Sequence, residues 1–88
     1  MKTHAVRLVE SSPGAYFVSY DGELILESRH PLKEAAGYLL ERKFAKPRDC
    51  LLAYRSDGEL LMGGQVAWLA CDAGVQSALA DFTLAVRH

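Results

Sequence analysis

The hexapeptide SYDGEL at residues 19–24 is repeated almost unchanged as RSDGEL at residues 55–60, and each copy lies between short apolar runs. An Asp-Gly pair between two β-prone runs favours a hairpin, because a type I′ turn needs positive φ at both central residues and these residue types tolerate it. We therefore expect two β-hairpins, with turns at residues 21–22 and 57–58, and we expect both Asp-Gly pairs to be ordinary turns without a catalytic role.

The two turns also predict which strand residues face each other. A two-residue turn pairs Val18 with Ile25 in the first hairpin and Tyr54 with Leu61 in the second. Successive side chains alternate between the two faces of a strand, so each hairpin has an inner and an outer face. The predicted inner face, to be covered by a helix, carries Phe17, Leu24, Leu26, Ala53, Leu60 and Met62. The predicted outer face carries Tyr16, Val18, Tyr20, Ile25, Leu52, Tyr54 and Leu61.

The main helix is predicted at residues 31–46. Apolar side chains recur there at three- and four-residue steps, Pro31 suits the first helical turn, and Pro47 ends the run. A glycine would be expected to close such a helix, but this chain has Lys43 and Phe44 there.

The other segments give weaker patterns, and together they predict one α+β domain that spans residues 1–88. We expect an antiparallel sheet built from the two hairpins plus edge strands, with the main helix and a weaker C-terminal helix on one side. The remaining predictions are a strand at residues 4–10, a turn at 11–14, a turn at 63–64, a helix or a strand at 65–71, a helix at 75–81 and a closing strand at 82–87.

Composition argues against several classes of protein. The chain has 88 residues and a net charge of −1, whereas a general nucleic-acid binder needs an excess of Lys and Arg. No run approaches the roughly 20 apolar residues of a membrane span, so we expect no membrane partner. The chain opens without the apolar run of a signal peptide, which predicts the cytoplasm. In that reducing compartment Cys50 and Cys71 are expected to be buried thiols.

No catalytic or metal-binding constellation is apparent. The three histidines lie beside no nucleophile motif, and no four ligands have the local spacing of a zinc site. The carboxylates beside the Asp-Gly pairs lie at exposed hairpin tips, where nothing would exclude water or shift a pKa. We therefore expect no enzyme, no catalytic residue, no metal and no cofactor.

The predicted outer face is more apolar and aromatic than a solvated face needs, so we expect something to cover it. The candidates are the C-terminal stretch around Trp68, a second copy of the chain, or a partner protein. Carboxylates border this face, which disfavours nucleic acid and complements a partner with a basic surface. The predicted partner-binding residues are Tyr16, Tyr20, Asp21, Glu23, Glu27, Tyr54, Asp57 and Glu59.

The stretch VESSPGAYFVSYDGELILESRHPLKEAAGYLL, residues 9–40, resembles short proteobacterial and phage-associated proteins in which such a hairpin leads through Pro-Leu into an Ala-Ala and Leu-Leu helix. Among such short phage products are anti-CRISPR proteins, cytoplasmic inhibitors that bind a CRISPR effector and block capture or cleavage of DNA. The resemblance implies a non-enzymatic inhibitor that occupies a basic, DNA-binding surface of a CRISPR-Cas surveillance complex in a bacterial host. It supplies no site motif, so it assigns no functional residue.

Two other functions stay open. One is a small homodimeric regulatory or assembly module of bacterial origin, whose aromatic sheet face is its own interface. The other is a nucleic-acid-binding regulator, although direct nucleic-acid binding is not expected from the near-neutral net charge. It would use the cations Arg29, Lys33, Arg42, Lys43, Lys46 and Arg48.

Overall fold

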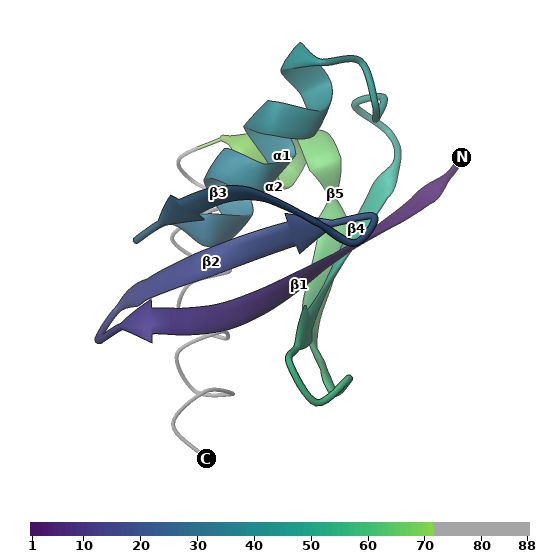
Figure 1. Ribbon diagram of the computed structural model, residues 1–88. Coiled ribbons are helices and arrows are strands. Elements are labelled where there is room, and N and C mark those ends of the chain that lie inside the picture. The colour runs from purple at the N-terminus through teal and green to yellow at the C-terminus, as the bar shows by residue number, and fades with distance from the viewer. Residues whose placement is uncertain (72–88) are drawn as a thin grey trace.

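A computed structural model describes residues 1–71, so the predicted helix at 75–81 and the predicted strand at 82–87 lie outside the described residues. Each hairpin is followed by a helix, so the described chain is one strand and then two successive ββα units (Figure 1). In chain order the elements are β1 (Thr3–Ser12), β2 (Ala15–Tyr20), β3 (Glu23–Ser28), α1 (Pro31–Glu41), β4 (Cys50–Arg55), β5 (Leu60–Gln65) and α2 (Val66–Ala70).

The five strands form one sheet in the order β3-β2-β1-β4-β5. β1 is antiparallel to β2 and parallel to β4, and both hairpins are antiparallel, so the sheet is mostly antiparallel. The predicted α+β class is confirmed. The prediction that strands outside the hairpins form the edges is wrong for β1, because this strand lies between the two hairpins and pairs with both.

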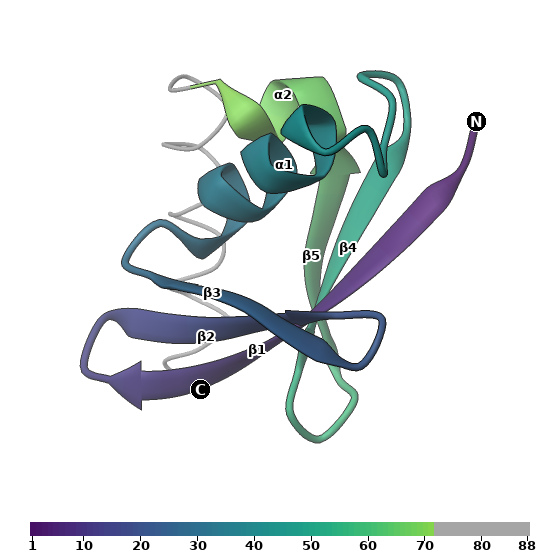
Figure 2. The same cartoon turned by 45° about the horizontal axis from the view of Figure 1, so that its top comes forward.

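Both described helices pack on the same face of the sheet, as Figures 1 and 2 show. The opposite face is covered by no helix among residues 1–71, and we call it the open face. The core lies between the helices and the sheet and consists of Val6, Leu8, Val18, Leu32, Ala35, Ala36, Leu39, Ala45, Leu51, Ala53, Val66 and Leu69.

α1 ends at Glu41, whereas the predicted helix ran on to residue 46. Its end is a Schellman motif, in which the Phe44 N–H donates to the Leu39 carbonyl at 2.9 Å and the Lys43 N–H to the Leu40 carbonyl at 3.1 Å. Lys43 has a φ of +61° there, the left-handed conformation that glycine usually fills. The apolar spacing continues past this point, which is why the sequence predicts too long a helix.

Both Asp-Gly pairs form hairpin turns as predicted, but with different geometries. Asp21 and Gly22 have φ of +53° and +83°, as a type I′ turn requires. In the second hairpin only Gly58 has a positive φ, of +93°. The Gly58 N–H donates to the Arg55 carbonyl at 2.9 Å, and the Arg55 N–H donates to the Glu59 carbonyl at 2.8 Å. This turn is therefore longer by one residue than the predicted one.

Each hairpin also contains a bulge just after its repeated Gly-Glu-Leu. In β3 the extra residue is Ile25, so Val18 pairs with Leu26 rather than with Ile25. In β5 the extra residue is Leu61, so Tyr54 pairs with Leu60. In the first hairpin the added residue makes the predicted register wrong beyond Ile25. In the second hairpin the longer turn shifts the pairing before Leu61 and the bulge restores it, so Ala53 pairs with Met62 as a two-residue turn at 57–58 predicts.

The predicted assignment of faces is wrong for most of the first hairpin, although Leu26 lies on the helix side as predicted. Val18 is fully buried beneath the helices, whereas Phe17 and Leu24 lie on the open face and Leu24 is 62% exposed. β2 carries large apolar or aromatic side chains on both faces, so alternation along this strand does not show which face is buried. Its pairing with β1 shows it, because Val18 lies opposite the buried Leu8.

The second hairpin follows the prediction only in part. Ala53 and Met62 lie on the helix side as predicted, but Leu60 lies on the open face and is 52% exposed. Gly63 and Gly64 belong to β5 and not to a turn. A Cβ at Gly63 would collide with the side chain of Leu52, so the glycine leaves room for this leucine on the open face.

Residues 66–70 form α2, the helical alternative for this part of the chain. α2 packs directly on Gly64, where a Cβ would lie 3.3 Å from the Trp68 ring. Trp68 is therefore on the helix side and does not cover the open face. None of the helices within residues 1–71 is long and apolar enough to span a membrane.

The prediction that both cysteines are buried is wrong. Cys50 is half-buried and Cys71 is exposed. The Cys71 thiol lies at the end of α2, where it donates to the Trp68 carbonyl at 3.0 Å.

Candidate functional site

The open face gathers four large apolar side chains that solvent can reach. Val9, Phe17, Leu24 and Leu60 are all exposed. Val9 lies opposite Phe17 near the middle of the sheet, whereas Leu24 and Leu60 lie on the two edge strands. The residues between these two leucines on the same face are Ser19, Arg7 and Tyr54. Scattered single apolar residues are normal on a protein surface, but a set on one sheet face is typical of a contact surface.

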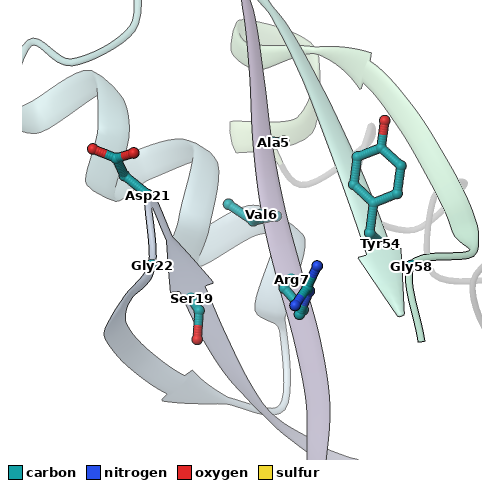
Figure 3. A pocket seen from close by; sticks show the side chains of 8 residues that line it. All are labelled: Ala5, Val6, Arg7, Ser19, Asp21, Gly22, Tyr54 and Gly58. Atoms are coloured by element: carbon teal, nitrogen blue, oxygen red, sulfur yellow. The ribbon is translucent and has the colours of Figure 1, made fainter. Parts of the chain in front are cut away.

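An open depression of about 590 Å³ lies on this face (Figure 3). Arg7 is central to it, because it pairs with Ser19 of β2 on one side and with Tyr54 of β4 on the other. Arg7 forms no ion pair with any other residue in 1–71, so its guanidinium donors can reach an acceptor on a ligand. The lining residues are Ala5, Val6, Arg7, Ser19, Asp21, Gly22, Tyr54 and Gly58.

The structure separates the three tyrosines that the sequence places on one surface. Tyr54 lies on the open face, in the depression. Tyr16 and Tyr20 lie on the helix side and pack against the core. Burial, with a smaller contribution from the charge of Glu10, raises the pKa of the Tyr16 hydroxyl. Only Tyr54 can therefore anchor a partner that docks on the open face.

Two of the three acidic residues of the first hairpin lie beside the open face. Asp21 lines the depression, and Glu23 follows the same turn. Glu27 lies opposite Phe17 on the open face and accepts a hydrogen bond from the Ser11 hydroxyl. Asp21 and Glu27 therefore give the open face a negative border, whereas Glu23 pairs with Tyr20 and so lies at the sheet edge toward the helix side.

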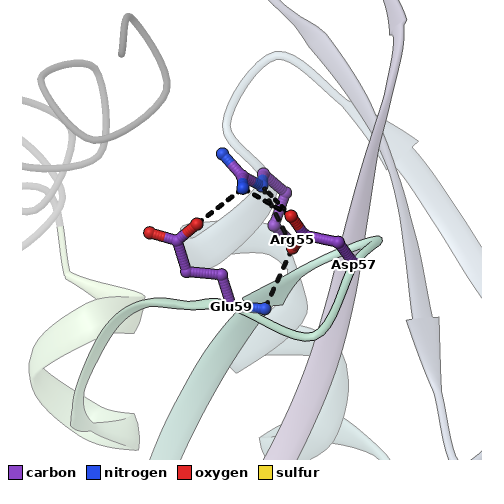
Figure 4. Close-up of polar contacts among 3 residues, drawn as sticks. All are labelled: Arg55, Asp57 and Glu59. Carbon is purple, nitrogen blue, oxygen red and sulfur yellow. Dashed lines mark hydrogen bonds and ion pairs between the residues drawn. The ribbon is translucent and has the colours of Figure 1, made fainter.

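The acidic residues of the second hairpin are partly neutralised within the chain. The Arg55 guanidinium forms ion pairs with both Asp57 and Glu59 (Figure 4). The hydrogen bond from Arg55, together with the Glu59 N–H, lowers the pKa of Asp57 to about 2. Two carboxylates and one guanidinium leave this tip with a single negative charge, so it contributes less to the border than predicted.

Tyr20, His4 and Asp49 form a hydrogen-bonded chain that the sequence did not reveal. His4 Nδ1 is 3.0 Å from the Tyr20 hydroxyl, and His4 Nε2 is 2.9 Å from Asp49 Oδ2. A carboxylate only accepts hydrogen bonds, so His4 Nε2 donates to Asp49. Asp49 also accepts the backbone N–H groups of Lys46 at 3.0 Å and Lys2 at 3.1 Å. These bonds, the one from Lys46 foremost, hold the pKa of Asp49 well below its usual range.

The order phenol, imidazole and carboxylate is that of a nucleophile, a base and an orienting group. However, the depression is lined by none of the three residues, and His4 and Asp49 are buried. The chain of hydrogen bonds instead joins the first residues of β1, the end of β2 and the loop before β4. The alternation of His4 with the apolar Val6 and Leu8 indicates that His4 shares their buried face of the strand. Its partner Asp49 is 45 residues away, so no local pattern reveals the pair.

Among residues 1–71 no three or more His, Cys, Asp or Glu side chains lie close enough together to hold a metal ion. Comparison with protein-family models, with curated proteins and with solved structures finds no match to this chain.

Proposed function

We propose that this protein is a non-enzymatic inhibitor that docks the open face of its sheet onto an apolar protein surface bordered by Lys and Arg. The observation that carries the proposal is the set of four exposed apolar side chains, Val9, Phe17, Leu24 and Leu60, on the face that no helix within residues 1–71 covers. Removal of such surface from water drives protein association. Tyr54 and Arg7 lie at the centre of this face, and both residue types are frequent binding hot spots.

The charges around the patch support a basic partner. Asp21 and Glu27 border it on the β2–β3 side, Glu23 follows at the edge of the sheet, and all three would attract Lys and Arg of the partner. Border charges of this kind mainly speed association. Arg7 adds a selective requirement, because a partner that buries its guanidinium must supply an acceptor opposite it.

The partner class that we propose is a CRISPR-Cas surveillance complex in the cytoplasm of a bacterial host, as the resemblance of residues 9–40 to anti-CRISPR proteins implies. A groove that holds DNA is rich in cations, and a protein seated in it would exclude the nucleic acid. In this proposal Tyr54, Asp21, Glu23 and Glu27 contact the partner. The other predicted contact residues, Tyr16, Tyr20, Asp57 and Glu59, are assigned structural or internal roles.

The test is binding of the purified chain to candidate effector complexes at low and moderate salt. We expect Phe17→Ser to weaken the complex roughly tenfold or more, as truncation of a buried aromatic anchor does. Phe44→Ser is the matched control, because Phe44 is also exposed but lies outside the open face. No complex with any effector, or equal effects of the two variants, would contradict the proposal.

A second candidate function is the homodimeric module, which one observation favours. Arg7 and Asp21 line the same depression, so a two-fold axis through the open face could place Arg7 of one copy against Asp21 of the other. Sedimentation at micromolar concentration measures the oligomeric state and so distinguishes the two candidate functions. A stable dimer that Leu24→Ser dissociates would support the module, whereas a monomer supports the inhibitor.

A further inference from the structure

The connection between α1 and β4 presents cations and an aromatic ring on one exposed loop. We call residues 42–48 the basic loop, since they contain four cations and no acidic residue. Lys43, Lys46 and Arg48 form no ion pair with any residue in the described part of the chain. The net charge of −1 for the whole chain conceals this local excess. The exposed side chains are Arg42, Lys43, Phe44, Lys46 and Arg48.

The basic loop is held in a defined conformation. Ala45 is buried in the core, and its N–H donates to the Leu39 carbonyl at 3.2 Å. At the other end the Lys46 N–H donates to the Asp49 carboxylate at 3.0 Å, and the Asp49 N–H donates back to the Lys46 carbonyl at 3.0 Å. The buried Asp49 carboxylate is thereby held by hydrogen bonds within the protein. A surface fixed in this way loses little conformational entropy when it binds a ligand.

Lys43 occupies a position where the backbone disfavours it. Its φ of +61° would suit glycine, and nothing in the Schellman motif uses its side chain. Residues in such disfavoured conformations cluster at functional sites. The side chain of Lys43 therefore adds a cation to the surface at some expense of stability.

Phe44 supplies a flat apolar surface among these cations. It is 50% exposed, and its ring stacks on Tyr20 with 6.0 Å between centroids and 19° between planes. Tyr38 lies beside it with 6.4 Å between centroids, and the Arg42 guanidinium lies 4.3 Å from the centre of the Tyr38 ring. One side of the Phe44 ring thus packs on Tyr20, while the ring stays half-exposed and can contact a ligand.

We propose that the basic loop binds single-stranded nucleic acid, with a base stacked on Phe44 and phosphates held by the surrounding cations. Single-strand-binding surfaces combine these two features, because cations follow the backbone and every base has a face that can stack. An acidic peptide would use the cations but not the flat ring, and a duplex keeps its bases stacked inside. Lys2 extends the cationic surface, because its own N–H and carbonyl bond to Asp49 and Cys50 next to the loop.

This site is separate from the docking surface proposed above, because the two share no residue. The sequence-based expectation against nucleic-acid binding used the net charge of the whole chain. The structure instead brings Arg42, Lys43, Lys46 and Arg48 to one loop, next to an exposed ring. Failure of one proposal therefore leaves the other standing.

The test is fluorescence anisotropy of the full chain with a labelled oligothymidylate of about ten nucleotides, within the size range of single-strand sites. Measured over a series of salt concentrations, the logarithm of the affinity should fall with a slope of about −3, since each of four phosphate contacts contributes about −0.7. Phe44→Ser should weaken binding roughly tenfold with the slope unchanged, because it removes stacking and not charge.

Three matched measurements make the outcome decisive. Phe44→Leu keeps the apolar contact with Tyr20 but not the flat ring, so it should lose most of the same affinity. Lys43→Gly suits the backbone and should reduce the slope by about 0.7. Phe17→Ser, on the open face, should bind like the unaltered chain. Absence of binding, equal affinity of Phe44→Leu and the unaltered chain, or tighter binding to a duplex or to polyphosphate would overturn the proposal.

Discussion

His4 and Asp49 lie 45 residues apart in the chain and are joined in the interior by a hydrogen bond of 2.9 Å between Nε2 and Oδ2. The bond links β1 to the loop that precedes β4, the two strands whose parallel pairing joins the two hairpins into one sheet. The same carboxylate accepts the Lys46 N–H, so it also fixes one end of the basic loop. The interior of the sheet and the proposed nucleic-acid site therefore depend on one residue pair.

Replacement of His4 should destabilise the protein. His4→Leu removes a donor from the buried carboxylate and the partner of the Tyr20 hydroxyl, and such a loss lowers the free energy of unfolding by about 1–3 kcal/mol. Urea denaturation measures the change. The matched control is His30→Leu, because His30 is exposed and its side chain makes no capping bond to α1. Equal stability of His4→Leu and the unaltered chain would contradict the structural role.

Stability should fall in acid because of Asp49. Its pKa is lower in the folded state than the ordinary value of 3.8, because Lys46, His4 and Lys2 donate hydrogen bonds to the carboxylate. The folded state therefore binds fewer protons, and this contribution is complete above the ordinary pKa and is lost as the pH falls below it. Urea midpoints between neutral pH and strong acid should drop more steeply below pH 4 for the unaltered chain than for Asp49→Asn. Parallel curves would contradict this prediction.

Lys43→Gly should stabilise the protein while it weakens nucleic-acid binding. Glycine adopts the left-handed conformation without a Cβ clash, which is worth about 1 kcal/mol and raises the Tm of a domain of this size by roughly 5 °C. Lys46→Gly removes the same charge from a position without positive φ, so it should not raise the Tm. Calorimetry of both variants checks the prediction, and an equal or opposite shift would contradict it.

Arg55→Gln should release the carboxylates of the second hairpin. The pKa of Asp57 should rise from about 2 toward its ordinary value of 3.8, because the hydrogen bond from Arg55 is the largest cause of the low value and its charge adds to it. Thermal stability should change little, since the ion pairs are exposed. Titration of the side-chain carboxyl by NMR measures the shift. Arg48→Gln is the control and should leave Asp57 unaffected.

The sequence predicts local structure well here. Residues 21–22 and 57–58 form turns because Asp and Gly suit them, and Pro31 begins α1 as its position indicates. The sequence predicts the register only in part, since Ser19 pairs with Leu24 and Ala53 with Met62 as two-residue turns predict, but the pairs beside them differ. The bulges at Ile25 and Leu61 follow from pairing across each hairpin, and no local pattern marks them.

The functional surfaces were predicted less well, for reasons of long-range geometry. Tyr16 and Tyr20 face the helices because Val18, between them, lies opposite the buried Leu8. Pairing of β1 with both hairpins is needed to see this. Similarly, the sequence alone favours ordinary solvated cations at the end of α1. The structure shows that the Schellman motif at Lys43 turns the chain and leaves Phe44 exposed among these cations.

The most direct test of the open face is hydroxyl-radical footprinting of the chain, free and in complex with an effector that retains it. The method reports the solvent exposure of Phe17, Leu24 and Phe44 in one experiment. The docking proposal predicts that binding slows oxidation of Phe17 and Leu24 and leaves Phe44 unchanged. Protection of Phe44 with no change at Phe17 and Leu24 would contradict it.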